Sequence, residues 1–333
     1  GHSVSVANET RLVAWSLHPH DLNMPTPPMD RELLAALPKS DLHVHLDGSL
    51  RLDTLLELAK QHRVKLPSRT RDGLLELVFK RAYKNLPEYL RGFEFTVACL
   101  KDSESLERAA YELCMDCRAE NVFYTEIRFA PQLHVSAGFP AKDHQAAYQL
   151  AHEHLLGKTV HAGEDYGPES IFQALTDCHA DRIGHGTWLF SQRHIRDRSI
   201  ADKRRFIDDL VRYIAERRIT LEVCLTSNQQ TIPELRDNLA RHPFKKMRAS
   251  RCSVALCTDN RLVSRTTMTD EVEKAVTAFR LDPRGVKDVL IYGFKRSFFA
   301  GSYAEKRVWV RSVLNHLEDV LASKGHDVHN RRR

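Results

Sequence analysis

No stretch of this 333-residue sequence approaches the eighteen uncharged apolar residues of a membrane-spanning helix, and no signal-peptide core follows its N-terminus. Glycine and proline number only 14 and 13, which excludes collagen-like and low-complexity chains. An excess of one charge is also lacking, because 50 basic and 44 acidic residues are interleaved and give a net charge of +6. These absences predict a soluble, globular, cytoplasmic protein without a membrane or nucleic-acid partner.

Cysteine is sparse, and the odd number of seven residues argues against a disulfide scaffold. Cys114 and Cys117 have the spacing of a redox or zinc pair, but no second pair completes such a site. Histidine, in contrast, occurs 18 times, which makes metal chemistry worth testing. The sequence therefore favours reduced, buried thiols and a histidine-based metal site.

Residues 1–29 show no sustained hydrophobic period and form a leader, whose opening Gly-His-Ser is typical of a cloning remnant. From Asp30 onward, short β-branched runs alternate with amphipathic segments. This alternation predicts one parallel α/β domain over residues 30–324, with a basic tail over residues 325–333. The expected strands are Asp41–Leu46, Val122–Phe129, Lys158–Ala162, Arg182–Gly186, Thr220–Leu225 and Ser253–Thr258.

Two expected helices carry apolar stripes with the period of 3.6 residues. The first stripe consists of Phe206, Leu210, Tyr213 and Ile214. The second, which should end at Gly325, consists of Val310, Val313, Leu314, Leu317 and Leu321.

Polar residues follow most of the expected strands at their C-terminal ends. The first strand ends in His43-Val-His45-Leu-Asp47, and the others end in His161-Ala-Gly163-Glu164, Gly184-His185-Gly186, Thr226-Ser-Asn228 and Thr258-Asp259-Asn260. The C-terminal ends of parallel barrel strands meet at one mouth. Two histidines at i and i+2 of a strand face the same side, so they can bind one metal ion. A third histidine and an aspartate would complete a zinc site.

Simpler interpretations exist for each motif taken alone. The His-x-His spacing recurs at His18 and His20, beside a proline, and at His152 and His154, within an expected helix, where i and i+2 face different sides. The other motifs are compatible with turns, helix caps or solvated loop acids. Five such coincidences at five strand ends are less expected than one shared site.

In order and spacing, these motifs resemble the adenosine deaminases of the metal-dependent amidohydrolase superfamily over about residues 30–324. The resemblance implies a (β/α)8 TIM-type barrel, with a metal site at the C-terminal strand ends, that removes the 6-amino group of a purine nucleoside as ammonia. It implies Zn²⁺ as the cofactor, with four ligands: His43, His45, His161 and Asp259. The zinc deaminases of cytidine lack support, because their His-x-Glu and Pro-Cys-x-x-Cys motifs do not occur.

The resemblance also implies catalytic roles. His185 would orient or deprotonate the attacking water with help from Asp259, and Glu164 would protonate purine N1 as water adds at C6. The role of Glu164 requires a raised carboxyl pKa, which a dry pocket provides.

Three further residues match positions that contact the substrate in the family. Asp47 would bind a ribose hydroxyl, and the backbone of Gly163 would approach the base. Asn260 stands where the family usually has a second aspartate, which in its protonated form donates a hydrogen bond to purine N7. An asparagine amide is also a donor, so purine recognition is retained in principle.

The number of strands departs from the family pattern. Six are recognisable where the barrel needs eight, and the two missing strand–helix units fall between Pro131 and His161. Only one helix, Ala141–Leu155, fits in that interval. We expect that the sequence omits a stretch of the natural chain, because loss of two units would expose a barrel edge. Consecutive Cα atoms within His134–Phe139 should then lie much more than about 3.8 Å apart.

Alternative functions remain at this point. Deamination of another 6-aminopurine nucleoside, of the aminofutalosine or N6-substituted type, would use the same motifs. A metal-dependent phosphoesterase would need additional acidic or histidine ligands for a site with several metal ions. The single acid of the motif that ends in Glu164 argues against this function. A non-catalytic, degenerate barrel is favoured only by the missing strands. The sequence leaves the oligomeric state open.

Overall fold

The computed structural model describes residues 27–129, 144–326 and 328. Within these ranges, six strands occur at all six expected places. They are β1 (Lys39–His45), β2 (Val122–Arg128), β3 (Thr159–Ala162), β4 (Arg182–His185), β5 (Thr220–Val223) and β6 (Ser253–Leu256). Every pair of neighbouring strands is parallel, which confirms the predicted α/β class.

The strands form an open arc. β1 pairs with β2, and the other four strands pair in the order β3-β4-β5-β6. A single parallel bridge between Val44 and Asp259 joins the two sheets, so the order across the arc is β2-β1-β6-β5-β4-β3. Its two free edges within the described ranges, β2 and β3, flank the interval where two barrel units were expected. His134–Phe139, the place of the expected chain break, lies outside the described residues.

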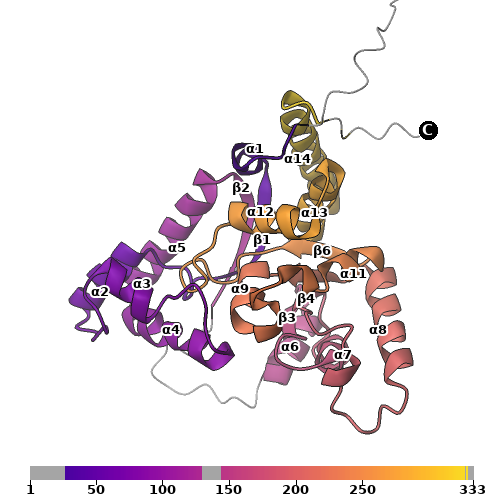
Figure 1. Ribbon diagram of the computed structural model, residues 1–333, viewed down its shortest axis with the longest axis horizontal. Helices are drawn as coiled ribbons and strands as arrows, with labels where there is room; N and C mark the ends of the chain where they lie inside the picture. Colours follow the sequence, from indigo (N-terminus) through magenta and orange to yellow (C-terminus); the bar gives the residue numbers. More distant parts are fainter. Residues whose placement is uncertain (1–26, 130–143, 327, 329–333) are drawn as a thin grey trace, which may run out of the picture.

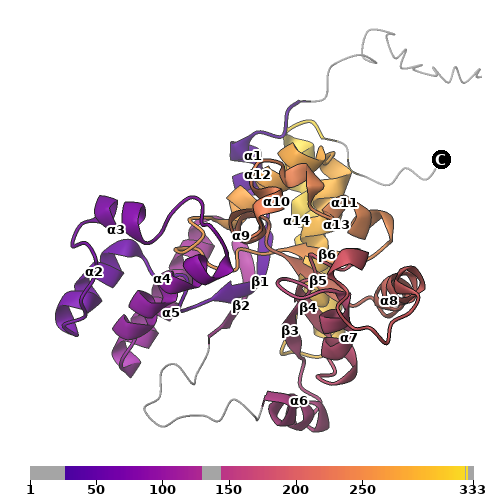
Figure 2. The ribbon, with the colours of Figure 1, turned by 60° about the horizontal axis from the view of Figure 1, so that its bottom comes forward.

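Helices surround the strands (Figures 1 and 2). In both views, α5 lies next to β1 and β2, with α2 and α3 further out on the same side, and α7, α8 and α11 lie on the side of the four-stranded sheet. None of the helices in the described ranges is long and apolar enough to span a membrane. The helices are α1 (Arg31–Ala36), α2 (Leu52–Gln61), α3 (Arg71–Leu77), α4 (Leu86–Cys99), α5 (Ser103–Ala119), α6 (His144–Glu153), α7 (Pro168–Thr176), α8 (Lys203–Arg217), α9 (Leu225–Thr231), α10 (Pro233–Arg236), α11 (Phe244–Ala249), α12 (Met268–Phe279), α13 (Pro283–Arg296) and α14 (Tyr303–Ser323).

The two predicted helix stripes are confirmed except at one position. In α14 the buried residues are Val313, Leu317 and Leu321, and Gly325 follows the helix with a positive φ of 82°. In α8, however, Tyr213 is 48% exposed and Ile207 is buried instead. The ring of Tyr213 lies on the solvent side beneath the guanidinium of Arg217, one turn further along, at 5.7 Å.

The remaining cysteine and histidine motifs lie apart from the expected metal site or outside the described residues. All seven cysteines are free, and in the Cys114–Cys117 pair the first is exposed and the second is buried. The ring of His152 stacks on that of His179 at 4.1 Å, away from the strand ends. His18 and His20 lie outside the described residues.

Strand β1 is fixed at both ends by buried polar contacts. At its start, the fully buried Nζ of Lys39 donates to the carbonyl oxygens of Leu34, Ala35 and Leu37 at 2.8 to 3.0 Å. The ammonium group thereby pairs carbonyls that the last turn of α1 leaves without helical partners. At its end, the N–H of His45 donates to the carbonyl of Asp259 at 2.7 Å. These contacts hold β1 beside β6, where the polar strand ends meet.

Candidate metal-dependent active site

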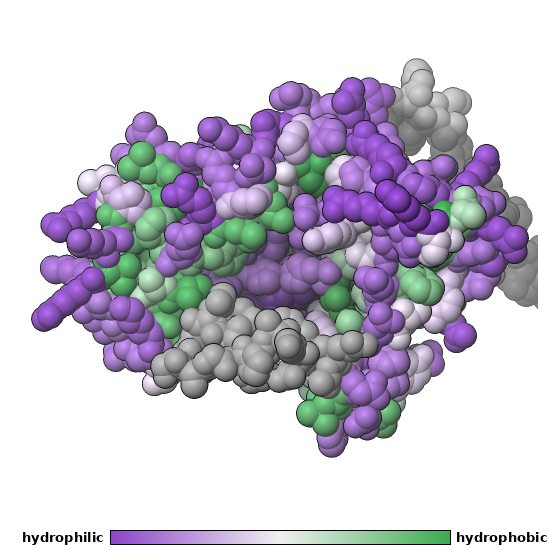
Figure 3. Space-filling view, turned by 90° about the horizontal axis from the view of Figure 1, so that it is seen from below, coloured by the Kyte–Doolittle hydropathy of each residue, from purple (hydrophilic) through white to green (hydrophobic). Residues whose placement is uncertain are grey.

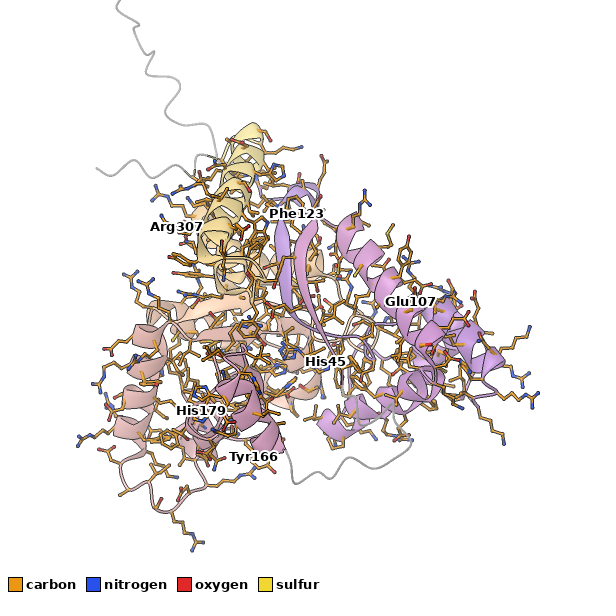
Figure 4. All side chains as sticks on the ribbon, turned by 180° about the vertical axis from the view of Figure 1, so that it is seen from behind. His45, Glu107, Phe123, Tyr166, His179 and Arg307 are labelled. Atoms are coloured by element: carbon orange, nitrogen blue, oxygen red, sulfur yellow. The ribbon has the colours of Figure 1, made fainter. Side chains whose placement is uncertain are left out.

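The strand ends bring the expected histidines and aspartate together. One ligand atom from each of His43, His161, His185 and Asp259 lies within 4.8 Å of the others. Figure 4 shows His45 near the centre of the molecule, whereas Phe123, at the start of β2, lies toward the opposite end of the strand pair. Figure 3 views the molecule from the side toward which these strands run, and shows a hollow lined by hydrophilic residues. The hollow and the cluster lie on the same side of the fold.

His45 lies close to the same cluster. Its Nε2 is 3.2 Å from Nε2 of His161 and 3.5 Å from Oδ1 of Asp259. Nε2 of His43 is also 3.5 Å from that oxygen. In a tetrahedral zinc site with bonds of 2.0 to 2.1 Å, neighbouring ligand atoms are about 3.4 Å apart. These spacings therefore fit four ligands around one ion.

The environment of His43 also fits a metal ligand. Its Nε2 is buried and has no hydrogen-bond partner among the described residues. A buried polar atom in this state is costly unless a ligand satisfies it. The opposite nitrogen, Nδ1, lies 2.9 Å from Oε2 of Glu222. A carboxylate only accepts, so Nδ1 carries the proton and the lone pair of Nε2 faces the cluster.

Glu222 is a fully buried anion that two arginines stabilise. It lies on β5, and its Oε1 accepts a hydrogen bond of 2.6 Å from Nε of Arg182. A terminal nitrogen of Arg128 is 3.3 Å from Oε2. Burial alone would raise the pKa of Glu222, but the hydrogen bond from His43 and the charges of the two arginines hold it well below its ordinary value. The carboxylate that orients His43 is therefore ionised.

Asp259 follows β6 in a left-handed conformation with φ of 62°, and His185 ends β4 with φ of 66°. Non-glycine residues in this region cost about 1–3 kcal/mol each, and they concentrate at functional sites. The N–H of Asp259 donates to the carbonyl of His43 at 2.8 Å. Burial favours a raised pKa for Asp259, but the adjacent imidazoles of His43 and His185 keep the pKa well below its usual range. Asp259 is an ionised carboxylate.

Glu164 has the opposite character. It lies just after β3 and is partly buried, and its Oε2 is 3.5 Å from Nε2 of His185. Burial, followed by the negative charge of Asp259, raises the pKa of Glu164 to about 8. The two carboxyl groups thus have pKa values on opposite sides of neutrality, an arrangement that separates an acid from a base.

Two expected substrate residues, Asp47 and Asn260, are buried at the same end of the strands. Asp47 Oδ1 is 3.9 Å from Nδ1 of His45. The amide of Asn260 donates to the hydroxyl of Tyr89 at 2.7 Å, and its Oδ1 has no hydrogen-bond partner among the described residues. Tyr89, from α4, in turn contacts Ser264 Oγ at 2.7 Å. The side chain of Asn260 is thus held by a buried phenol.

Gly163 has a conformational reason to be glycine. Its φ is 67°, and a Cβ there would lie 2.6 Å from the side chain of Ile171. Its N–H already donates to Ser170 Oγ at 2.9 Å, and its carbonyl accepts from the N–H of Trp188 at 2.8 Å. Both polar groups of the Gly163 backbone are therefore used within the chain, and its contact with a purine stays a prediction.

Sequence reasoning named no role for several residues that shape the site. Glu222 could have been found, because a carboxylate in the middle of a buried, β-branched strand needs a charged partner. Tyr89 and His242 lie in helical or irregular segments far from the strand-end motifs, and no local pattern indicates them. Asn228 was predicted as a polar residue at a strand end, but the sequence does not indicate which side chains it contacts.

A family model described as adenosine deaminase matches residues 38–143 and 137–313 of this chain. The adenosine deaminase of Vibrio atlanticus is 30% identical over 330 residues, which cover 79% of this chain and 94% of that protein. The chain belongs to the adenosine deaminase family. It is an adenosine deaminase-like aminohydrolase. The match to the family is divided into two stretches that meet at residues 137–143, inside the interval where two barrel units were expected.

Other comparisons agree on the family and fold. A probable adenosine deaminase of Dictyostelium discoideum is 28% identical over 334 residues, covering 80% of this chain but only 41% of its own length. The solved adenine deaminase of Arthrobacter aurescens superimposes with a TM-score of 0.70 at 21% identity, over 86% of this chain and 100% of that one. A Burkholderia ambifaria amidohydrolase solved with bound Zn gives 0.69 at 18% identity, over 91% and 96%. The arc of strands is thus of the deaminase barrel type.

Proposed function

We propose that this chain catalyses the zinc-dependent hydrolytic deamination of adenosine or 2′-deoxyadenosine to the corresponding inosine nucleoside and ammonia. The observation that carries the proposal is the pairing of an acid with a metal-ligand cluster. A carboxyl group with a raised pKa, Glu164, lies beside four closely spaced ligand atoms, one of which belongs to the ionised Asp259. Adenosine deaminases among the relatives, and a zinc-containing structural neighbour, support the substrate class and the metal.

In this proposal, His43, His45, His161 and Asp259 hold the metal. The carboxylate and three imidazoles form the mixed oxygen and nitrogen set that zinc favours. When bound, zinc supplies Lewis acidity, which makes a water molecule acidic enough to act as a nucleophile near neutral pH. Glu222, through His43, and the backbone contacts of Asp259 keep the donor atoms in place before the ion binds.

The side chains around the cluster perform the proton transfers. Glu164 is protonated at neutral pH and donates its proton to purine N1 as water adds at C6. His185 and Asp259 orient that water and take up its proton. The proton taken from the water passes to the 6-amino group, which leaves as ammonia. The C6 hydroxyl then loses its proton to restore the acid form of Glu164, and the carbonyl of the product forms. A protonated Glu164 is essential here, because an ionised carboxylate has no proton to give.

Substrate binding in this proposal uses Asp47 for a ribose hydroxyl, the backbone near Gly163 for the base, and Asn260 for purine N7. An amide nitrogen carries two hydrogens, and Asn260 uses one of them to hold Tyr89. The second hydrogen is available to the acceptor N7. The side chain therefore keeps a donor for the purine, where the family usually has a carboxylic acid.

The test follows the loss of adenosine by ultraviolet absorbance and measures the metal content of each protein. Glu164→Gln keeps the size of the side chain but removes the acid, so kcat should fall by about 10²–10⁴-fold with zinc still bound. Asp165→Asn changes the exposed neighbouring carboxylate and should leave kcat within about threefold. Full turnover in Glu164→Gln, or in chelated wild-type protein, would contradict the proposal. A higher kcat/KM for an N6-substituted or aminofutalosine-type nucleoside would correct the substrate alone.

A further inference from the structure

A backbone amide behind the active site determines the protonation of a buried histidine. The N–H of Phe244 lies 3.1 Å from Nδ1 of His242. A backbone N–H can only donate, so Nδ1 must accept. His242 is 2% exposed, and burial, together with the nearby His185, lowers the pKa of its imidazole to about 3. The ring is therefore neutral, and its single proton lies on Nε2.

This proton fixes the orientation of an asparagine amide. Nε2 of His242 lies 3.2 Å from Oδ1 of Asn228, and Thr187 Oγ1 donates to the same oxygen at 3.1 Å. The reversed amide would place its NH₂ group against the N–H of His242, donor against donor. Asn228 Nδ2 therefore points to the other side, where Nδ1 of His185 lies at 3.2 Å. Since an amide nitrogen only donates, Nδ1 of His185 accepts.

We propose that His242 and Asn228 are positioning residues that keep the proton of neutral His185 on Nε2, so that His185 donates a hydrogen bond to the reacting water and does not remove its proton. This inference rests on the proposed deamination, in which His185 and Asp259 share the tasks of orienting the water and taking up its proton. It assigns each task to one residue. His185 orients the water, and the ionised Asp259 is the group that takes up its proton. Nε2 of His185 is buried and makes no hydrogen bond among the described residues, although Oε2 of Glu164 lies 3.5 Å away. In this proposal Glu164 is a protonated acid that serves the purine, so the N–H of His185 serves the water.

The same reasoning separates His185 from the metal ligands. Its nitrogen belongs to the cluster of ligand atoms that lie within 4.8 Å of one another. A histidine nitrogen must offer a lone pair to bind a metal, and Nε2 of His185 carries a proton. His43, whose ring centroid is 5.0 Å away, has the opposite tautomer, because its Nδ1 faces the carboxylate of Glu222. Two adjacent histidines thus receive different roles from the partners behind them.

Long-range proton–nitrogen NMR on ¹⁵N-histidine-labelled protein tests this directly, because a protonated and an unprotonated ring nitrogen differ widely in chemical shift. The His185 signals are assigned by their loss in His185→Gln. In wild-type protein without substrate, Nε2 should carry the proton and Nδ1 should not. Asn228→Asp replaces the donor by an acceptor of the same shape, so the proton should move to Nδ1. A proton on Nδ1 in the wild type, or an unchanged tautomer in Asn228→Asp, would overturn the inference.

Substitutions one step further back provide a graded test. His242→Gln can still donate to Asn228 and should keep the wild-type tautomer, whereas His242→Met leaves Asn228 free to turn and should give a mixture of tautomers. His326→Gln is the matched control, because His326 is buried without a hydrogen-bond partner among the described residues and is not part of this chain of contacts. A single wild-type tautomer in His242→Met would contradict the role of His242.

Kinetics give an independent readout on zinc-loaded protein. The wrong tautomer in Asn228→Asp should lower kcat on the order of 10⁴-fold, as it does in the triad of a serine protease, with little change in KM. If Asn228→Asp keeps the wild-type kcat although the proton of His185 has moved to Nδ1, the tautomer of His185 has no role in catalysis and the inference is refuted. The NMR measurement needs no substrate, so a wild-type protein with the expected tautomer but without deaminase activity would refute the proposed function and leave the tautomer assignment intact.

Discussion

Removing the charge of Glu222 should weaken metal binding although Glu222 is not a ligand. Its carboxylate accepts hydrogen bonds from His43 Nδ1 at 2.9 Å, Arg182 Nε at 2.6 Å and Thr159 Oγ1 at 3.0 Å. In Glu222→Gln, the NH₂ group must face at least one of these donors. The His43 ring then loses the acceptor that keeps the lone pair of Nε2 directed at the cluster.

Two magnitudes follow from this geometry. Loss of a hydrogen-bond partner behind a metal-binding histidine typically lowers metal affinity by about 10–100-fold, or about 1.4–2.7 kcal/mol. Removing one partner of a buried ion pair costs about 3–5 kcal/mol of folding free energy when the other charge is left unpaired. Arg182 is buried but still pairs with Glu126, so the loss should be at the lower end of this range. Both losses should occur in Glu222→Gln.

The matched control is Glu126→Gln. Glu126 also binds Arg182, but it is partly exposed and does not contact His43. Zinc affinity would be measured by competition with a chromophoric chelator, and the free energy of unfolding by urea titration of metal-free protein. Glu222→Gln should lose at least about tenfold in affinity, and Glu126→Gln less than about threefold. Equal zinc affinities of the two variants would refute the argument that Glu222 orients His43.

Two further predictions concern buried ionisable groups outside the cluster. Lys39→Met leaves the carbonyls of Leu34 and Leu37 without their donor, whereas the carbonyl of Ala35 keeps a hydrogen bond from Asn121. The free energy of unfolding in urea should fall by about 2 kcal/mol or more, and the exposed Lys101→Met should change it by less than about 0.5 kcal/mol. Burial raises the pKa of Glu271 to about 7, above its ordinary value of 4.5, so the folded state binds this proton more tightly than the unfolded state. The free energy of unfolding should therefore fall by about 3 kcal/mol as pH rises from about 4.5 through 7, and Glu271→Gln should lack this decrease. If the free energies of unfolding of the wild type and of Glu271→Gln change in parallel with pH, the raised pKa of Glu271 is contradicted.

The strand-end site was predictable because the geometry of a parallel sheet does not depend on sequence separation. His43 and Asp259 are 216 positions apart, yet both lie at the C-terminal ends of parallel strands, which meet at one edge. The order of the strands across the arc was implied by the barrel to which the motifs are similar. Alternation of β-branched runs and amphipathic helices was sufficient to place all six strands.

The contacts behind the site were not predictable from local patterns. Tyr89 and His242 act through tertiary contacts with Asn260 and Asn228, and nothing in their own segments distinguishes them from ordinary core residues. Tyr213 fitted an apolar stripe but is exposed, because an amphipathic tyrosine beside an arginine is stable on the solvent side of a helix. The hydrophobic period predicts which face of a helix is buried. The burial of a single side chain at the border of that face, and its tertiary partners, depend on individual contacts.

The open arc affects the parts of the site unequally. His43 and Asp259 lie on strands with neighbours on both sides and are buried, whereas His161 lies on the edge strand β3 and is exposed. Two additional strand–helix units between β2 and β3 would pair both free edges and cover His161. The division of the family match at residues 137–143 supports our proposal that the sequence omits this stretch of the natural chain. The residues proposed as ligands and acid lie in, or just after, strands β1, β3 and β6. The unpaired edges should therefore affect how the substrate is enclosed more than how the metal is held.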